Sequence, residues 1–415
     1  MFESILFLIS PFIYCADILI PKSKKKILFY GRLGHFTGNP KYLYQYICEN
    51  LNYHCIWLSR HHEEADKLAQ KYGDKSILYI ENIKGIVYLL VHYLTAKNLI
   101  IRGKDDLWPL RRYTSSRRRT VIDLLHGVPI KNTGIMVPGR DEPQTEKKEI
   151  KKRDAITYHT VPSDLVRYFL SACYSVSLRK FPITGDPRND TLIKLKDNPE
   201  IIRDQIVEKC DIGVDFEKII LYAPTHRDPC MLAENEERPP QFFPFPDFSR
   251  EQLVAWLEEK SAILLLRTHA LSTGYDNQIS DISRIPPGVG SSNRVYFCPH
   301  KLMSEANELL AAVDILWTDY SGIYLDFLLT ERPVLFIPYD LQEYKKYRGI
   351  LFDYNLITPG PKVLHQASLL GKSSNFLDTS KEDVYAERRK WLKKLFHEHT
   401  DGQACDRITR LIEKS

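Results

Sequence analysis

The sequence predicts an α/β protein with two domains, each built on a parallel sheet. From Lys24 onward, short runs of β-branched, aromatic and aliphatic residues alternate with longer amphipathic stretches, which is the rhythm of βαβ units. A charged stretch around residues 198–209 interrupts this rhythm, and a second series of strands begins at Lys218. The length of 415 residues fits two or three domains, because a domain holds about 150 residues.

The first series alternates strands with helices. The expected strands are 26–30, 53–58, 76–80, 98–101, 120–125, 156–161 and 181–185, because each is a short, mainly apolar run. The expected helices are 42–51, 63–71, 83–93 and a segment opened by Ser163 and Asp164. Residues 138–154 are polar and charged, so we expect a mobile surface loop there.

The second series has the same alternation. Its expected strands are 218–223, 262–267, 294–298, 315–318 and 333–338, with a helix at 250–260. Residues 228–246 are rich in Pro, Glu and Phe and are expected to form a loop, whereas 381–413 should form one amphipathic helix. The expected division is an apolar segment at 1–23, domains at 24–205 and 206–375, and a carboxy-terminal helix within 376–415.

Composition and charge exclude some classes of protein for this chain. With 43% hydrophobic and 27% charged residues, the chain differs from disordered and polytopic membrane proteins. Residues 1–160 hold 26 Lys and Arg against 16 Asp and Glu, whereas the remainder holds 32 against 37. The basic first half indicates either an anionic partner, such as a phospholipid surface, a phosphorylated substrate or nucleic acid, or a solvated basic face. The eight cysteines include no C-x-x-C pair, so we expect reduced thiols and no zinc framework.

The amino terminus is apolar from residue 4 to residue 20, with Pro11 and Asp17 inside the run. The lysines at 22 and 24–26 follow this run, which is the wrong order for a signal peptide. A transmembrane helix needs about 20 uninterrupted apolar residues, and Pro11 breaks this segment. Two alternatives stay open: an interfacial helix whose lysines meet anionic headgroups, or a helix docked on the protein's own core.

Chemistry-bearing residues follow the ends of several expected strands, where open α/β sheets bind their ligands. His126 precedes a glycine and then a proline two residues on, so a rigid turn holds its imidazole at a strand end. Such an imidazole can act as a general base for a hydroxyl, although a turn of this kind can also be purely structural. Arg267 and His269 alternate along a strand end, so both point to one face and suit either phosphate oxygens or an ordinary buried pair.

Residues 318–326 run from a strand directly into a helix. This places Ser321 and several backbone N–H groups at a helix amino terminus, which favours anions. Gly322 lets a phosphate approach the backbone, and Asp326 can accept hydrogen bonds from a ribose or polyol. The alternative is that Ser321 is a plain helix N-cap.

Together these segments resemble the CDP-glycerol glycerophosphotransferase family of teichoic-acid and capsule synthesis. The family pattern includes a His-Gly-Thr-Pro turn, Gly-x-Pro-Arg-x-Asp, Tyr-Ala-Pro-Thr-x-Arg, Arg-x-His and Thr-Asp-Tyr-Ser-Ser followed by Asp. The matching segments, in family order between about residue 26 and residue 365, are 126–129, 185–190, 222–227, 267–269, 318–326, 332–333, 339–340, 344, 348–349, 353–354 and 359–361.

The resemblance implies a GT-B fold, with two Rossmann-like domains facing across a cleft. It implies transfer of a glycerol-phosphate or related polyol-phosphate unit from a CDP-activated donor to a hydroxyl of a membrane-linked glycan or polyol-phosphate acceptor, with release of CMP. His126 would be the base on the acceptor hydroxyl, and His269 would contact the donor phosphates. The implied donor-site residues are Gly127, Val128, Pro129, Ile130, Arg188, Thr225, His226, Arg227, Arg267, Thr268, Ser321, Gly322 and Asp326.

A membrane-linked acceptor would place the enzyme peripherally at the cytoplasmic face of a bacterial membrane. The expected acceptor and membrane side includes Arg111, Arg112, Arg117, Arg118 and Arg119, together with the apolar start of the chain. No nucleic acid is expected as a partner. No cofactor or metal is expected either, because the sequence shows no Asp-x-Asp metal clasp.

Three positions depart from the family pattern: Val128 replaces Thr, His226 replaces Trp, and Gly322 replaces the second Ser. Gly322 keeps its backbone N–H, so donor binding should persist, whereas His226 leaves the donor open between glycerol, ribitol and another polyol. A single pair of domains favours a primase or single-step transferase over a polymerase. The rival functions are a GT-B glycosyltransferase or epimerase that uses a UDP- or CMP-sugar, and a non-catalytic binder of nucleic acid or anionic lipid.

Overall fold

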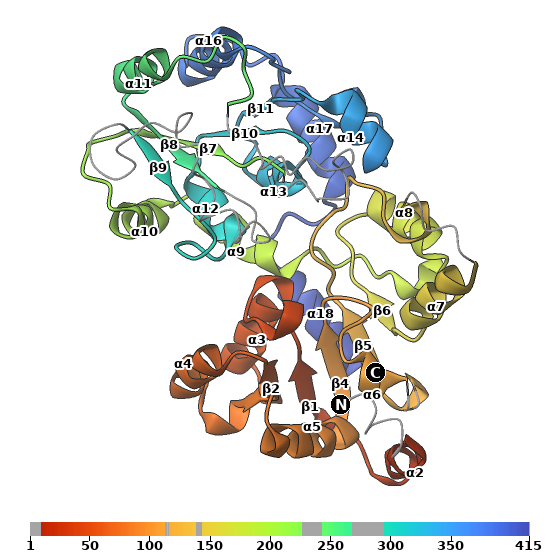
Figure 1. The fold of residues 1–415 in the computed structure, drawn as a ribbon. Coiled ribbons are helices and arrows are strands. Elements are labelled where there is room, and N and C mark those ends of the chain that lie inside the picture. Colours follow the sequence, from red (N-terminus) through yellow and green to blue (C-terminus); the bar gives the residue numbers. More distant parts are fainter. Residues whose placement is uncertain are drawn as a thin grey trace, which may run out of the picture. The chain divides into compact units, whose positions relative to one another are not determined.

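Each predicted series of strands forms a parallel sheet of its own, and the two sheets lie in separate units of the chain (Figure 1). The computed structural model describes residues 10–112, 114, 116–137, 143–225, 243–267 and 294–414. Unit 1 comprises Met1–Gly127, Thr133–Asp190 and Glu398–Ser415, and unit 2 comprises Val128–Asn132 and Thr191–His397. The predicted α/β class with parallel sheets is confirmed.

The sheet of unit 1 has the strand order β3-β2-β1-β4-β5-β6, and its neighbouring strands are all parallel. The strands are β1 (Ser23–Phe29), β2 (His54–Ser59), β3 (Ile77–Tyr79), β4 (Ala96–Ile101), β5 (Thr120–Asp123) and β6 (Tyr158–His159). The helices are α2 (Ser10–Leu19), α3 (Gly38–Asn50), α4 (His62–Tyr72), α5 (Ile83–Thr95), α6 (Trp108–Arg111), α7 (Pro143–Asp154), α8 (Asp164–Tyr174), α9 (Pro187–Leu195), which continues into unit 2, and α18 (Ala404–Glu413).

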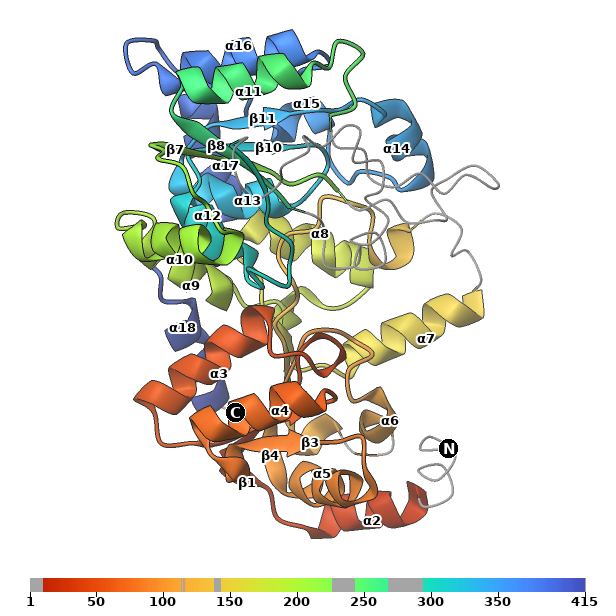
Figure 2. The same cartoon turned by 60° about the vertical axis from the view of Figure 1, so that its left-hand side comes forward.

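Helices cover both faces of the sheet of unit 1 (Figure 2). An apolar layer lies between the sheet and the helices on each face. On one face, Phe29 and Trp57 pack with residues of α3, α4 and α18. On the other face, Leu28 and Ile56 pack with residues of α2 and α5. Successive side chains of a strand point to opposite faces, so burial on both faces explains why the strands are continuous apolar runs.

The sheet of unit 2 has the strand order β11-β10-β7-β8-β9, again entirely parallel. Its strands are β7 (Lys218–Tyr222), β8 (Ala262–Leu266), β9 (Val295–Phe297), β10 (Ile315–Thr318) and β11 (Val334–Phe336). Its helices are α10 (Glu200–Cys210), α11 (Arg250–Glu259), α12 (Ala306–Ala312), α13 (Ile323–Phe327), α14 (Leu341–Tyr347), α15 (Tyr354–Ile357), α16 (Gln366–Leu377) and α17 (Ala386–Phe396). Trp317 of β10 and Trp256 of α11 lie in the core on one face of this sheet.

Four stretches differ from the prediction. Residues 181–185 do not form a strand of the sheet, because only Ile183 pairs there, in an isolated parallel bridge with Val161. Residues 143–154 form helix α7 instead of part of a surface loop, because Glu, Gln and Lys are good helix formers even without an apolar face. The carboxy-terminal stretch forms two helices, α17 and α18, and Gly402 between them has a φ of 67°. The expected loop 228–246 lies mostly outside the described residues.

Helix α18 belongs to unit 1 because the Gly-x-Pro-Arg-x-Asp segment holds its first turn. The two carboxylate oxygens of Asp190 accept the backbone N–H groups of Ala404 and Cys405, each at 2.9 Å. Such caps satisfy N–H groups that have no partner inside the helix. The chain passes from unit 1 to unit 2 directly after Asp190, earlier than the predicted boundary at residue 205.

The described part of the apolar amino-terminal segment forms helix α2, which docks on unit 1 by its inner side. Ile13 is buried in the same core layer as α5, and the fully buried Asp17 pairs with Lys22 at 3.1 Å and with Arg119 at 2.5 Å. Phe12, on the outer side, is 76% exposed. None of the helices in the described ranges has the length and apolar character needed to cross a bilayer.

Candidate functional site

The predicted base His126 lies beyond the carboxyl end of β5, in a turn with unusual backbone geometry. Leu125 has a φ of 50° and Gly127 a φ of 100°, so the residues on both sides of His126 are in the left-handed region. For a residue other than glycine this costs about 1–3 kcal/mol, and it persists where surrounding contacts impose it. One such contact is the backbone N–H of Leu125, which donates to Asp123 Oδ1 at 3.0 Å.

Asp123 is itself held by a buried partner. Its Oδ2 lies 3.1 Å from Nδ1 of His159, and Nε2 of His159 lies 3.2 Å from the carbonyl oxygen of Arg153. Burial alone would raise the pKa of Asp123, but the hydrogen bonds from His159 and Leu125 hold this pKa below its ordinary value. An ionised, fixed carboxylate therefore anchors the turn that carries His126.

The imidazole of His126 is held in its neutral form. Its side chain is exposed by surface area, yet its pKa is lowered to about 4. Desolvation is the largest cause of this shift, and the positive charges of Arg102 and Arg188 contribute to it. Nη1 of Arg188 donates to the carbonyl oxygen of His126 at 3.1 Å, which fixes one of these charges beside the turn. A neutral imidazole can accept a proton, which a general base requires.

The segment that follows the turn belongs to unit 2, because the chain changes unit between Gly127 and Val128. There the N–H of Leu351 donates to the carbonyl of Ile130 at 2.8 Å, and Arg348 donates to the carbonyl of Asn132 at 2.8 Å. The segment after the His126 turn is therefore hydrogen-bonded to the segment that begins at Arg348, although the two are more than 200 residues apart in the sequence. The side chain of Ile130 is buried, so among the predicted donor residues it serves packing.

In unit 2, several predicted donor residues lie beyond the carboxyl ends of β7, β8 and β10, which are adjacent in the sheet. The backbone N–H of Thr225 donates to Asp319 Oδ1 at 2.8 Å, and the Thr318 hydroxyl donates to the carbonyl of Ala223 at 2.8 Å. The Tyr354 hydroxyl donates to the carbonyl of Asp319 at 2.9 Å. These bonds lock the ends of β7 and β10 together and keep Thr225 in a fixed position.

Arg267 follows β8 and is 6% exposed. Its Nη1 donates to the carbonyl oxygen of Cys298 at 3.4 Å. Burial lowers the pKa of this guanidinium, and Cys298 and Glu305 act in the opposite direction. A buried guanidinium at the carboxyl edge of a parallel sheet is a suitable partner for a phosphate group, which it can bind through two parallel hydrogen bonds.

The segment after β10 enters helix α13 as predicted. Ser321 Oγ accepts the backbone N–H of Ile323 at 3.5 Å, so the hydroxyl lies at the N-cap side of this short helix. A Cβ added to Gly322 would lie 3.2 Å from the carbonyl oxygen of Val128, which gives a steric reason for glycine where the family pattern has serine. Asp326, within α13, is 2% exposed.

Four predicted site residues lie outside the described residues: His226, Arg227, Thr268 and His269. Their roles stay predictions, including the contact of His269 with donor phosphates. Within the ranges that the structure describes, no group of three or more His, Cys, Asp and Glu side chains is placed to hold a metal ion.

Two of the arginines predicted for the acceptor and membrane side are buried among structural partners. Arg111 is 6% exposed and donates to three backbone carbonyls. Arg119 is 3% exposed, donates to the carbonyl of Tyr93 and pairs with Asp17. The predicted arginines that keep exposed surface are Arg112, Arg117 and Arg118.

The sequence prediction overlooked two residues at the carboxyl edge of unit 1. Arg102 is the first residue after β4, and the predicted strand 98–101 ends at the same residue, so the strand-end rule could have singled it out. Asn39 is buried near the start of α3, where its amide donates to the carbonyl of Leu124 at 2.8 Å and accepts the backbone N–H of Arg188 at 3.2 Å. No sequence pattern marks Asn39, because its partners come from distant segments.

Comparisons with known proteins identify relatives of this chain. The teichoic acid glycerol-phosphate transferase of Staphylococcus aureus is 28% identical, over 98% of this chain and 98% of its own length. The teichoic acid poly(glycerol phosphate) polymerase of Bacillus spizizenii is 25% identical, over 92% and 93%.

Solved structures show the same fold. The wall teichoic acid polymerase TagF superposes with a TM-score of 0.73 at 23% identity, covering 95% of this chain and 89% of that one. A variant of TagF soaked with CDPG gives a TM-score of 0.73 at 22% identity and the same coverage. The model of the CDP-glycerol:poly(glycerophosphate) glycerophosphotransferase family matches residues 13–414. The chain therefore belongs to this glycerophosphotransferase family, with an α/β fold of parallel sheets like that of TagF.

Proposed function

We propose that the protein transfers a glycerol-phosphate or related polyol-phosphate unit from a CDP-activated donor to a hydroxyl of a membrane-linked glycan or polyol-phosphate acceptor, in teichoic-acid or capsule-type polymer synthesis. The observation that carries this proposal is the match of the family model over residues 13–414. A neutral, rigidly held His126 in the matching His-Gly-x-Pro turn supports it.

In the proposed reaction, His126 takes the proton of the acceptor hydroxyl, whose oxygen attacks the phosphorus that carries the glycerol. The new P–O bond forms as the bond from that phosphorus to the oxygen of CMP breaks, and CMP leaves. The transferred proton stays on the imidazole until it passes to solvent. Arg267 and the N–H groups around Ser321 would neutralise the diphosphate, because phosphoryl transfer depends mainly on positioning and charge stabilisation.

The rival reaction, transfer of a sugar from a UDP- or CMP-sugar, shares the fold class. The family match over nearly the whole chain favours the polyol-phosphate reaction instead. Non-catalytic binding of nucleic acid requires no neutral histidine in a strained turn, so it leaves His126 without a role.

The donor assay tests the proposal. Purified protein is incubated with CDP-glycerol, CDP-ribitol or a UDP-sugar and a lipid-linked acceptor, and CMP release and acceptor mass are measured. We expect CMP release with one of the two CDP-polyols and a mass increase of the matching polyol phosphate. CMP release without a change in acceptor mass, or transfer of a sugar, would contradict the proposal.

We further propose that unit 1 binds a membrane surface peripherally, at the cytoplasmic face, through the outer sides of α2 and α5. On α5, Ile83, Val87 and Val91 are spaced by one helical turn and are 83%, 54% and 52% exposed. On α2, Phe12 and Leu19 are 76% and 78% exposed. Both helices cover the same face of the sheet of unit 1 (Figure 2). Exposed apolar side chains on neighbouring helices are typical of an interaction surface.

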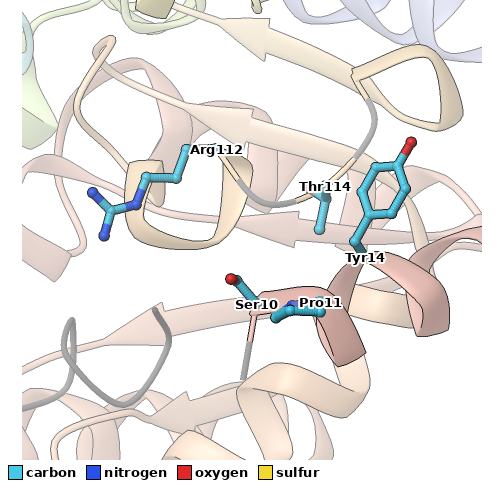
Figure 3. A pocket seen from close by; sticks show the side chains of 5 residues that line it. All are labelled: Ser10, Pro11, Tyr14, Arg112 and Thr114. Atoms are coloured by element: carbon cyan, nitrogen blue, oxygen red, sulfur yellow. The ribbon is translucent and has the colours of Figure 1, made fainter. Parts of the chain in front are cut away.

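Basic residues accompany these apolar side chains. Lys24, Lys84 and Arg117 are exposed on or near α2, α5 and the segment before β5. A shallow pocket between the first turn of α2 and the segment after α6 is lined by Ser10, Pro11, Tyr14, Arg112 and Thr114 (Figure 3). Apolar residues flanked by lysine and arginine are typical of surfaces that bind anionic lipid headgroups.

Replacing Val87 by glutamate is expected to weaken binding to vesicles of phosphatidylglycerol and phosphatidylcholine about tenfold or more, because a charge enters the apolar face. Sedimentation of the protein with vesicles measures this. Val384→Glu is the matched control, since Val384 is 74% exposed in unit 2. Equal binding of the two variants would remove α5 from the proposed membrane surface. Point variants are preferable to deletion of residues 1–21, which would leave the buried Arg119 without Asp17.

A further inference from the structure

Three arginines gather near His126 at the carboxyl edge of unit 1. Arg32 follows β1, Arg102 follows β4, and Arg188 lies in the first turn of α9. β1 pairs in parallel with β4, and β4 pairs in parallel with β5, whose end leads to His126. Residues that follow neighbouring parallel strands share one edge of the sheet, which is where ligands bind in this class of fold.

The start of α3 brings two of these arginines together. The backbone N–H of Arg188 donates to Oδ1 of Asn39 at 3.2 Å, and Nη1 of Arg188 donates to the His126 carbonyl at 3.1 Å. At Gly38, the residue before Asn39, an added Cβ would lie 3.8 Å from the guanidinium carbon of Arg102. Arg102 and Arg188 therefore approach adjacent residues of α3, and Arg188 also contacts the His126 turn.

Three acidic side chains of the described residues lie near this cluster, and each has a partner of its own. Asp106 accepts the backbone N–H of Arg102 at 3.0 Å, but burial raises its pKa to about 7, so it is partly protonated at neutral pH. Asp123 is engaged with His159, and Asp186 accepts the side-chain amide of Asn39 at 3.2 Å. The charges of Arg102, Arg188 and Arg32 each lower the pKa of His126, and the effects of Arg102 and Arg188 are each larger than the opposing effect of Asp123.

We propose that Arg32, Arg102 and Arg188 form a phosphate subsite for the acceptor, which holds the acceptor's terminal phosphate while His126 deprotonates its hydroxyl. This inference rests on the proposed function and deepens it, because it specifies an acceptor that ends in a polyol phosphate. The sequence prediction placed Arg188 in the donor site. Its contact with the His126 turn in unit 1 assigns it to the acceptor, whereas Arg267 and Ser321 of unit 2 remain for the donor diphosphate.

The kinetic test compares two lipid-linked acceptors, one ending in glycerol phosphate and one ending in a sugar without phosphate. For Arg102→Gln we expect KM for the phosphate-bearing acceptor to rise about tenfold or more, with unchanged KM for CDP-glycerol. Arg179→Gln is the control, because it removes an equal charge from an exposed position outside the cluster. A rise in KM for CDP-glycerol instead would assign Arg102 to the donor, and unchanged kinetics would overturn the subsite.

A binding test separates the subsite from the reaction. The His126 ring signals are followed by NMR across pH, with and without sn-glycerol 3-phosphate. We expect the phosphate to raise the pKa of His126 by about one unit, because a bound anion offsets the arginines. In Arg102→Gln, this pKa should already be raised without ligand, and added phosphate should change it little. A phosphate effect without turnover of any CDP-polyol would retain the subsite and reject the proposed reaction, whereas no phosphate effect in the unmodified protein would reject the subsite.

Discussion

Replacing His126 by alanine is expected to lower turnover about a hundredfold or more, with little change in KM for the CDP-polyol. The imidazole is the group in the described part of unit 1 that is neutral, exposed and held by a strained turn at the carboxyl edge of the sheet. Its removal leaves water as the acceptor of the proton. Because the side chain is exposed, the free energy of unfolding should change by no more than about 0.5 kcal/mol.

Steady-state CMP release measures the effect, and chemical denaturation measures stability. The matched control is His54→Ala, because His54 is an exposed histidine at the opposite, amino-terminal end of β2. Turnover within a few-fold of the unmodified protein in His126→Ala would exclude His126 as the base. A loss of turnover together with a large loss of stability would point to a structural role of the turn instead.

The pH dependence follows from the direction of the shift at His126. Its pKa is lowered from 6.5 to about 4, so the neutral form that accepts a proton persists well below neutral pH. We expect kcat/KM to stay nearly constant from about pH 8 down to about pH 5 and to fall below that, because kcat/KM reports the pKa of the free enzyme. A half-maximal value near pH 6.5 would contradict the environment described for this imidazole.

The sequence predicted the strands of both sheets well because their apolar runs are buried on both faces. In β10, for example, all residues from Ile315 to Thr318 are buried. The strand therefore lacks the alternation of polar and apolar residues that is typical of a strand with one exposed face. The strand-end rule then led to His126, Thr225 and Arg267, since their positions depend only on where each strand stops.

Local sequence patterns did not predict the contacts between segments that are far apart in the chain. The residues that follow His126 join unit 2 because Arg348 and Leu351, far along the chain, hydrogen-bond to them. α18 joins unit 1 because Asp190 caps it. From the sequence, a charged residue such as Arg119 is expected at the surface. The structure shows that it is buried and forms an ion pair with Asp17. Each of these facts depends on a partner more than 100 residues away.

Replacing Gly127 by alanine is expected to lower kcat/KM about a hundredfold, although the change adds one methyl group. Gly127 has a φ of 100°, which an alanine adopts only with strain, and the new Cβ would lie 2.0 Å from Nη2 of Arg188. Either the guanidinium or the turn must move. The turn contains His126, and the guanidinium donates a hydrogen bond to the His126 carbonyl, so either movement displaces the imidazole. A displacement of about 1 Å at a reacting group is enough for a loss of this size. We also expect the free energy of unfolding to fall by about 1–3 kcal/mol.

Two further glycines separate the causes. Gly73→Ala tests the backbone alone, because Gly73 has a φ of 89° but no atom within 4 Å of the new Cβ. Gly213→Ala tests the added methyl group in open space. We expect Gly73→Ala to lose about 1 kcal/mol of stability and Gly213→Ala almost none, with normal turnover in both. If Gly127→Ala lost stability as Gly73→Ala does but kept its turnover, the contact between Arg188 and the His126 turn would have no part in catalysis. A loss of turnover confined to Gly127→Ala would identify strain and crowding at the His126 turn as the cause.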